Sequence, residues 1–266
     1  GWIAYLGDAS LLDFQNAASF TEAQLEQFGQ RLDQLCAYLT EKDILFLFVL
    51  PPSKNTIYPE YLPAGLPTLG PRSRLDQVKE IWQETDSCEM IDLREPLLRA
   101  RESQPVYFAT DTHWNSYGAF VGYQEISRVV SARFPAVQTL SLADLEAVNQ
   151  QFQGDMTTPL FGCVQVEETS TFLIPGSGRQ NSLTQYPDNL VISANPNKRL
   201  PSALAFGDSF FYGMVAYLVE DFSEMTGYYL PSLDVPQIDM GLVKARRPDV
   251  LIFELTERNL EYLNHL

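Results

Sequence analysis

Short apolar runs recur along this 266-residue chain, and the first of them constrains the fold most strongly. It reads DILFLFVLPP (residues 43–52), is apolar on both faces and ends at two prolines. Such a run is typical of a central strand in a parallel sheet, because helices cover both faces of that kind of sheet. Further strand-like runs lie at 89–93, 106–109, 202–206, 224–230 and 248–255.

Segments with helical spacing separate these runs. In TEAQLEQFGQRLDQLCAYLTEK (residues 21–42), Thr21 can cap a helix and Gln24 occupies the capping-box position. Strands that alternate with helices indicate an α/β fold, with three layers (α/β/α) and a mostly parallel central sheet. The other predicted helices lie near 71–86, 94–103, 115–134, 209–222 and 235–247.

The length of the chain suits one large α/β domain, so we expect a single domain over residues 1–266. Residues 134–200 are less regular than the rest. They contain GDMTTPLFG, the β-like run CVQVEETSTFLI (163–174), and a connection rich in Gly, Ser, Asn and Pro. We interpret 134–200 as an insertion or lid segment within the domain.

The chain is strongly acidic, with 34 Asp and Glu against 18 Lys and Arg and a formal net charge of −16. This balance argues against a nucleic-acid-binding protein, which needs basic residues to meet phosphates. It also argues against electrostatic docking on an anionic membrane. No apolar run reaches the ~18 residues of a membrane span. The abrupt apolar opening, GWIAYLGD, suggests that a targeting segment precedes it.

Three cysteines, Cys36, Cys88 and Cys163, lie far apart and include no CxxC pair. A structural zinc site is therefore not expected. The three thiols allow one disulfide and leave one cysteine over, and the count alone does not fix the pairing.

The stretch YFATDTHWNSYGAF (residues 107–120) holds His113, one of only two histidines in the chain. Asp111 precedes it by two residues, so a loop can fold the carboxylate onto the imidazole. A serine hydroxyl becomes a good nucleophile when such a base accepts its proton. A D-x-H pair also occurs in metal sites, but no second internal histidine is present to complete a zinc site. A carboxylate-rich magnesium site is the remaining metal alternative.

The second candidate motif is AFGDSFF, in which Gly207 permits a sharp turn between a strand and a helix. Ser209 would begin that helix, where free backbone N–H groups can stabilise an oxyanion. The plainer alternative is that Asp208 or Ser209 only caps the helix. Ligands of parallel sheets bind at the carboxyl ends of strands, and both motifs follow strand-like runs. The loop at 256–258 also follows one.

Together these motifs resemble the SGNH-hydrolase-like O-acetyltransferases of the alginate type, the AlgX/AlgJ family. The resemblance runs in the family's order through GWIAYLGD, PPSKNTIYPEYLP, DTHWNSYGA, GDM (154–156), AFGDSFF and PDVLIFELTER. It implies an SGNH-hydrolase-like fold in a circularly permuted order, because ordinary SGNH hydrolases place the serine before the Asp–His pair. It also implies that Ser209 is the nucleophile, His113 the base and Asp111 the orienting acid, without a metal or other cofactor.

Two features depart from the family pattern. The usual GxND oxyanion block is replaced by ELTERN, where Thr256, Arg258 or Asn259 can substitute and the sequence does not choose among them. The additional carbohydrate-binding module of AlgX-type proteins is not in this sequence. Gly154 of the GDM motif is a further candidate for the oxyanion or substrate site.

Two roles are possible for the aromatic residues near the motifs. Trp114, Tyr117 and Tyr123 can line a sugar-binding cleft, but core packing is the expected role for at least two of them. Tyr58, Tyr61 and Lys54 can border the same edge or lie in a solvated loop, and Glu257 can form an ion pair with Arg258 that props the site. The sequence does not separate these alternatives.

The expected function is O-acetylation of an exported polysaccharide through an acetyl-serine. The alternatives are an SGNH-type carbohydrate acetylesterase and a non-catalytic polysaccharide-binding scaffold of an export complex. The expected partners are a polysaccharide acceptor, an acetyl donor and export or membrane acyl-transfer proteins, with no nucleic acid. The resemblance also implies a periplasmic or extracellular location with an N-terminal membrane anchor outside this sequence.

Overall fold

The structure is a computed structural model that describes residues 1–84, 88–157, 166–176, 181–187, 189–232 and 237–265. Its α-helices are α1 (Ser10–Phe14), α2 (Glu22–Glu41), α3 (Lys54–Ile57), α4 (Arg74–Gln83), α5 (Arg94–Ala100), α6 (Ser116–Arg133), α8 (Ser209–Leu218) and α9 (Met240–Arg246). Its strands are β1 (Leu45–Leu50), β2 (Glu89–Asp92), β3 (Leu145–Phe152), β4 (Glu168–Pro175), β5 (Ser182–Gln185), β6 (Val191–Ala194), β7 (Ser202–Gly207), β8 (Glu224–Tyr229) and β9 (Val250–Glu254). Short 3-10 helices include η4 (Glu257–His265).

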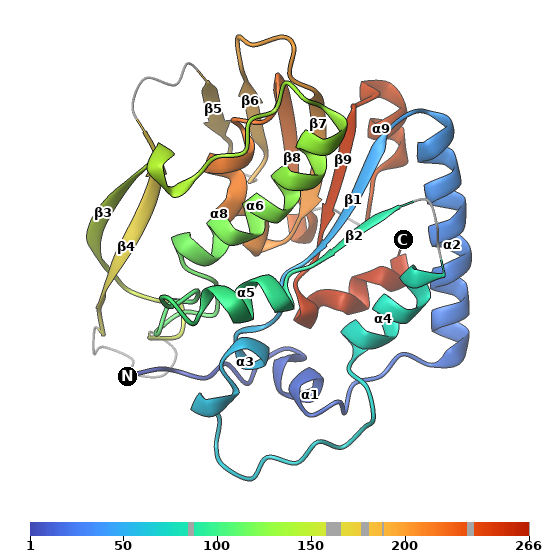
Figure 1. Cartoon of the computed structure of the whole chain (residues 1–266). Helices are drawn as coiled ribbons and strands as arrows, with labels where there is room; N and C mark the ends of the chain where they lie inside the picture. Colours follow the sequence, from blue (N-terminus) through green and yellow to red (C-terminus); the bar gives the residue numbers. More distant parts are fainter. Residues whose placement is uncertain (85–87, 158–165, 177–180, 188, 233–236, 266) are drawn as a thin grey trace.

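The central sheet has seven strands in the order β2-β1-β9-β7-β8-β6-β5 (Figure 1). All pairings from β2 to β8 are parallel, and β6 and β5 extend the sheet by antiparallel pairing. The predicted α/β class with a mostly parallel sheet is therefore confirmed. Since β1, β9 and β7 are parallel neighbours, the loops that follow them meet at one edge of the sheet.

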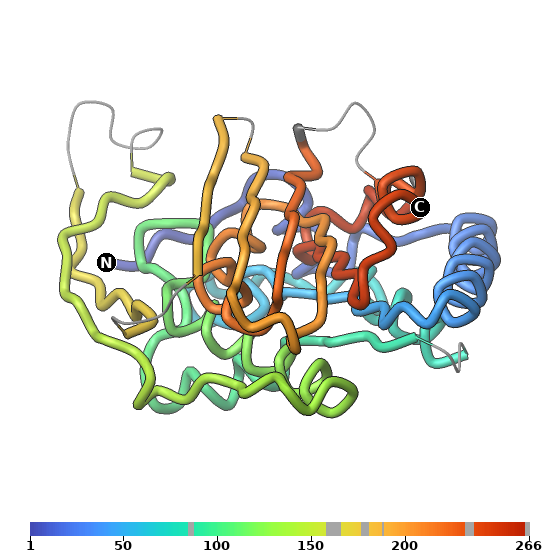
Figure 2. The backbone as a smooth tube through the Cα atoms, turned by 90° about the horizontal axis from the view of Figure 1, so that it is seen from above, coloured from blue at the N-terminus to red at the C-terminus, as the bar shows by residue number. Residues whose placement is uncertain are grey.

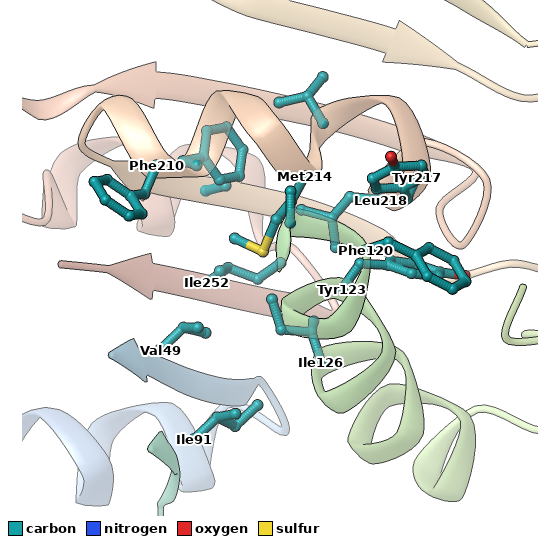
Figure 3. Close-up of a cluster of buried hydrophobic side chains, with 14 of the residues drawn as sticks. Val49, Ile91, Phe120, Tyr123, Ile126, Phe210, Met214, Tyr217, Leu218 and Ile252 are labelled. Carbon is teal, nitrogen blue, oxygen red and sulfur yellow. The ribbon is translucent and has the colours of Figure 1, made fainter. Parts of the chain in front are cut away.

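Strand β1 shows why its run is apolar on both faces. Leu47 and Val49 belong to the hydrophobic cluster under α6 and α8, whereas Phe46 and Phe48 belong to the cluster under α2 and α4. Figure 3 shows side chains of three neighbouring strands pointing towards α6 and α8, with Met214 between the layers. Each face of the sheet is thus buried under helices, as expected for parallel strands.

Helix ends follow the signals in the sequence. Thr21 and Gln24 form both hydrogen bonds of the capping box that begins α2. The side chain of Asn115 caps α6 by accepting a hydrogen bond from Gly118 N. Within the described residues, no helix combines the length and hydropathy that crossing a membrane requires.

One cysteine pair is joined. Cys36 in α2 forms a disulfide with Cys88, next to the start of β2, across 52 residues of sequence. Cys163 lies outside the described residues. The disulfide ties a helix of one outer layer to the edge of the central sheet.

Residues 134–200 contain two different structures. Strands β3 and β4 form a separate antiparallel pair, which Figure 2 shows at the opposite end of the molecule from α2. Strands β5 and β6, in contrast, belong to the central sheet. The assignment of 134–200 to one insertion stays a prediction, and its last part contributes to the main fold.

The prediction of a strand at residues 106–109 is wrong. This segment has only an isolated bridge between Tyr107 and Trp114 and does not join the sheet. Its backbone groups are used elsewhere: Phe108 N donates to His113 O, Val106 N to Tyr58 Oη, and Ala109 O accepts from Ile3 N. Asp111 and His113 therefore lie in a tight loop before α6 and do not follow a strand.

Candidate active site

The turn after β7 places Ser209 at the first position of α8. Only glycine fits at position 207, because a Cβ there would lie 2.5 Å from Phe211 Cβ and 2.8 Å from a carboxylate oxygen of Glu254. Asp208 caps the helix by accepting a hydrogen bond from Phe210 N. The capping role proposed for Asp208 is thus present, and it leaves the hydroxyl of Ser209 available for another partner.

That partner is His113. Its Nε2 lies 2.7 Å from Ser209 Oγ, and its Nδ1 lies 2.7 Å from Asp111 Oδ1. The backbone N–H of His113 also donates to Asp111 Oδ1, at 2.8 Å, which fixes the loop that carries both residues. The side chains of Asp111, His113 and Ser209 therefore form one hydrogen-bonded chain, although Ser209 follows His113 by 96 residues in the sequence.

Asp111 is buried but remains suited to carry a charge. Burial opposes ionisation, whereas hydrogen bonds from the His113 side chain and from Asp155 N favour it, together with the charge of a protonated imidazole. The favourable contacts outweigh the burial, and the pKa of Asp111 is lowered from its usual value. An ionised Asp111 can hold the imidazole in one orientation and stabilise its protonated form.

Asp155 is part of this site, although the sequence interpretation assigned only its neighbour Gly154. Asp155 N donates to Asp111 Oδ2, and the carboxylate of Asp155 accepts hydrogen bonds from Thr112 N and Oγ1. One of its oxygens also lies 3.5 Å from His113 Nδ1. The GDM motif was the available signal, and its aspartate braces the Asp–His loop.

Gly154 has a structural explanation. Its N–H donates to Thr110 Oγ1, and a Cβ at this position would fall 2.0 Å from Thr110 O. The proposed oxyanion role for Gly154 is therefore corrected, because its donor is already used and its lack of a side chain permits close approach to the loop.

The substrate-binding role considered for Lys54 and Tyr58 is also corrected, because both side chains are buried. The Lys54 ammonium donates to the carbonyl oxygens of Ile3, Ala109 and Asp111, so it fastens the Asp–His loop from below. Burial lowers the pKa of Lys54 to about 8, and nearby acidic residues oppose this shift. The Tyr58 hydroxyl accepts a hydrogen bond from Val106 N.

The loop after β9 supports the turn that carries Ser209. Thr256 N and Oγ1 donate to the Asp208 carboxylate, and so does Asn259 Nδ2. The oxyanion role considered for Thr256 and Asn259 is corrected, because their donors hold the capping aspartate. Glu254, at the end of β9, accepts from Asp208 N. The turn that carries Ser209 is thus anchored to β9 and the loop after it through a buried polar network.

Arg258 lies closest of these loop residues to the open site. Its guanidinium is 5.2 Å from the centre of the Phe210 ring and 5.4 Å from that of Tyr5, and it approaches Asp8 at 3.8 Å. Glu257 was expected to form an ion pair with Arg258. Its carboxylate instead accepts hydrogen bonds from Ser53 N and Thr56 Oγ1.

The aromatic residues near His113 divide as expected. Trp114 and Tyr123 are buried in the core, although Trp114 also borders the pocket that contains Ser209. Its indole ring packs against Phe210, with ring centres 5.1 Å apart, directly under the histidine loop. Tyr117 is only partly buried, and Tyr61 is exposed and stacks on Trp2.

Two pockets open on either side of His113. One, of about 390 Å³, contains Ser209 and an aromatic wall. Its lining residues are Phe108, Asp111, His113, Trp114, Phe152, Asn189, Ser209, Tyr212, Gly213 and Tyr229. The other, of about 490 Å³, contains Arg258, Asp155, Tyr5 and Met156. His113 therefore borders both pockets, and Ser209 lines the first of them.

The acids around His113 also raise the metal alternative. Ligand atoms of Asp111, His113 and Asp155 lie within 4.8 Å of one another. However, the Asp111 oxygens accept from His113 and Asp155 N, and those of Asp155 accept from Thr112. Since hydrogen-bond donors already occupy these oxygens, the cluster fits a proton-relay site better than a cation site.

Residues 9–173 match the model of the family described as SGNH hydrolase-like domain, acetyltransferase AlgX. This range is more than half of the chain and contains Asp111 and His113. The chain belongs to this family. The match ends before Ser209. The place of Ser209 beside His113 is therefore known from the structure and not from this match.

Similar proteins agree with this family membership. The chain is 25% identical to the Probable alginate O-acetylase AlgJ of Pseudomonas syringae pv. tomato over 235 residues, which cover 81% of this chain and 57% of that protein. The chain thus spans little more than half the length of this curated relative.

Solved structures show the same fold. Bacillus cereus PatB1 matches with a TM-score of 0.70 and 20% identity over 91% of this chain and 92% of that one. The O-acetyltransferase domain of Pseudomonas putida AlgJ matches with a TM-score of 0.56 and 19% identity, over 96% of this chain and 88% of that one.

Proposed function

We propose that this protein is an O-acetyltransferase that moves acetyl groups onto a polysaccharide through an acetyl-serine at Ser209. The observation that carries the proposal is the hydrogen-bonded chain from Asp111 through His113 to Ser209, with both contacts at 2.7 Å. Family membership supports acetyl transfer as the reaction class. The name of the AlgJ relative, an alginate O-acetylase, supports a polysaccharide as the acceptor.

The first half-reaction forms the acyl-enzyme. His113 Nε2 takes the proton of Ser209 Oγ while that oxygen attacks the acetyl carbonyl carbon of the donor. The bond from this carbon to the donor's leaving oxygen breaks, and the imidazolium returns the proton to that oxygen. Asp111 stabilises the imidazolium through its bond to Nδ1.

The second half-reaction reverses the roles. A sugar hydroxyl loses its proton to His113 and attacks the acetyl carbonyl, so the new sugar ester bond forms as the bond to Ser209 Oγ breaks. The proton then passes from His113 to Ser209 Oγ. The open pockets on both sides of the imidazole support an arrangement in which donor and acceptor approach separately.

The transient oxyanion needs hydrogen-bond donors near Ser209. Ser209 begins the ten-residue helix α8, and the first N–H groups of a helix lack acceptors within the helix. Their dipoles favour negative charge, so the N–H of Ser209 supplies one donor of the oxyanion hole. Thr256 and Asn259 contribute by fixing the Asp208 cap.

An extracytoplasmic location is part of the proposal. The Cys36–Cys88 disulfide suits an oxidising compartment such as the bacterial periplasm or the cell exterior. There the protein would act on a polysaccharide during export, with an acetyl donor supplied by membrane acyl-transfer proteins.

Acetyl ester hydrolysis is the second candidate function. The His113 side chain is 29% exposed, so water can reach the group that activates the acceptor. The same acetyl-serine would then be attacked by water, and free acetate would form in place of an acetylated sugar.

The test is to incubate the protein with a chromogenic acetyl ester, with and without an oligosaccharide panel, and to analyse the products by mass spectrometry. Acetylated oligosaccharide that forms with the unchanged protein, and not with Ser209→Ala, supports the transferase. Free acetate alone with every acceptor assigns the acetylesterase. A protein that releases no chromogenic leaving group from the ester, with or without an acceptor, would contradict both.

A further inference from the structure

The pocket that contains Ser209 adjoins a second pocket across the Phe108 ring. The second pocket, of about 260 Å³, lies between residues 104–117 and strand β4, and Phe108 lines both pockets. Phe152 lines the first pocket and packs on Phe108 with ring centres 4.1 Å apart, so the shared ring belongs to an aromatic wall of the first pocket. A ligand of several sugars that starts at Ser209 would reach the second pocket past the Phe108 ring, which borders both.

The second pocket has the chemistry of a site for uncharged sugars. Gln104 and Ser170 supply uncharged polar groups, and Tyr117 supplies an aromatic surface with a hydroxyl. Gln104 is exposed, and Tyr117 and Ser170 are partly exposed, so all three can reach a ligand. Sugars combine apolar faces with hydroxyl rims, and a pocket with apolar walls and a few polar groups suits both.

Charge separates neutral from anionic glycans at this surface. Among the described residues that line the two pockets, those with charged side chains apart from His113 are Asp111 and Glu168, both acids. The Glu168 carboxylate accepts from Ala109 N and from Thr110 N and Oγ1, which holds it in place beside the pocket. A polyuronate would meet two carboxylates here and no lining Lys or Arg.

The basic residues near the site do not offset the negative charge of Asp111 and Glu168. The Lys54 ammonium is enclosed by three carbonyl oxygens beneath the loop. Arg258 lines the pocket on the other side of His113, where Asp8 faces it at 3.8 Å. The formal net charge of −16 acts in the same direction, since it repels a polyanion at long range.

We propose that the acceptor is a glycan of neutral sugars, and that it extends from Ser209 across Phe108 into the pocket lined by Gln104, Tyr117 and Ser170. This inference rests on the proposed acetyl transfer and adds the class of acceptor. Specificity against uronates would come from the repulsion by Asp111 and Glu168, which is a cost to the wrong ligand.

The test compares neutral hexose oligomers with uronate oligomers of the same length, with one chromogenic acetyl ester as the donor. Hydrolysis of the ester without an acceptor first establishes that the acyl-enzyme chemistry works. We expect acetylated neutral oligomers, a lower KM for tetramers than for monosaccharides, and a KM at least about tenfold higher for uronates because of like-charge repulsion. Higher ionic strength should narrow that difference.

Two variants with the same charge change sharpen the test. Gln104→Lys puts a cation in the second pocket and should lower the KM for uronates by about two- to fivefold, as an exposed ion pair does. Gln27→Lys makes the same change on an exposed position of α2, away from the pocket, and should leave both KM values unchanged.

The possible outcomes separate the two proposals. Uronates acetylated as well as or better than neutral oligomers would overturn the neutral acceptor and leave the transferase intact. Equal effects of Gln104→Lys and Gln27→Lys would overturn the location of the acceptor in the second pocket. Free acetate alone with all acceptors would overturn the transferase itself and the acceptor with it.

Discussion

Two buried carboxyl groups, Asp111 and Glu254, contact the residues around the Ser209 turn, and their pKa values are shifted in opposite directions. Asp111 accepts three hydrogen bonds, from His113 N, His113 Nδ1 and Asp155 N, and its pKa is lowered. Glu254 accepts from Asp208 N through one oxygen, and its other oxygen has no partner among the described residues. Burial raises the pKa of Glu254 well above its usual value, and the neighbouring Asp208 carboxylate adds to the shift.

The comparison shows that hydrogen-bond donors decide whether the pKa of a buried acid is lowered or raised. Burial disfavours the charged form of both groups, but only Asp111 has enough donors to overcome it. An ionised Asp111 can stabilise the imidazolium of His113. The raised pKa of Glu254 favours its protonated form, which can accept the hydrogen bond from Asp208 N without placing a second negative charge beside Asp208.

The largest effect is expected from loss of the nucleophile or the base. Ser209→Ala and His113→Ala should each lower the rate of acetyl ester cleavage by about 10⁵-fold, because the two residues act as a unit. The double variant should be scarcely worse than either single variant. Steady-state kinetics measures the rates, and circular dichroism checks that each variant folds. Losses that add up in the double variant would show that the two side chains act independently.

Asp111→Asn should have the next largest effect. The asparagine cannot stabilise the imidazolium and can favour the wrong tautomer, so we expect a rate lower by about 10³- to 10⁴-fold. The loss should be smaller than in Ser209→Ala, since His113 keeps part of its function. A rate within tenfold of the unchanged protein would remove Asp111 from the relay.

Substitution of Glu254 tests the other side of the comparison through stability. Glu254→Ala leaves the Asp208 N–H without its acceptor and a hole behind the turn, and should lower the free energy of unfolding by about 2–4 kcal/mol. Glu254→Gln keeps an acceptor and mimics the neutral acid, so it should lose much less. Chemical denaturation measures both.

The contribution of Glu254 to the free energy of unfolding depends on pH. Glu254 has a higher pKa in the folded state than its usual 4.5, so the folded protein binds the extra proton between these two values. The stability of the unchanged protein therefore falls in that window as pH rises, by at most about 1.4 kcal/mol per pH unit from this group. Glu254→Gln should remove that part of the fall. A parallel pH profile for the two proteins would show that Glu254 is ionised.

Metal removal should have the smallest effect. The oxygens of Asp111 and Asp155 already accept hydrogen bonds, so chelation with EDTA should change the rate of ester cleavage less than about twofold. Added zinc or magnesium should do no more. Activity that is lost on chelation and restored by a divalent ion would assign the Asp111–His113–Asp155 cluster to a cation.

The sequence predicted the parallel sheet because its strands are apolar on both faces, as in β1, and its helices carry their own caps. It also predicted that Asp111, His113 and Ser209 would come together, because His113 is the one histidine away from the C-terminus and the DTHW and GDS motifs match the family pattern. It failed for Lys54 and Tyr58, whose polar ends bind backbone groups inside the fold.

The other misses share one cause. Nothing local in the sequence shows that a carbonyl or a capping carboxylate will take up a donor from a distant segment. Thr256 and Asn259 looked free for an oxyanion, but the structure joins them to Asp208, 48 and 51 residues away. Asp155 was missed for the same reason, because its partners lie 43 and 44 residues earlier.

The most direct test of the account is to locate the acetyl group on the protein itself. The protein is mixed with an acetyl ester, quenched in acid within the first turnover, digested and analysed by mass spectrometry. We predict one acetyl group on the peptide that contains Ser209, absent from Ser209→Ala and removed when an acceptor is added before the quench. Acetylation of a different residue, or rapid turnover with no acetylated peptide in either protein, would contradict the acetyl-serine mechanism.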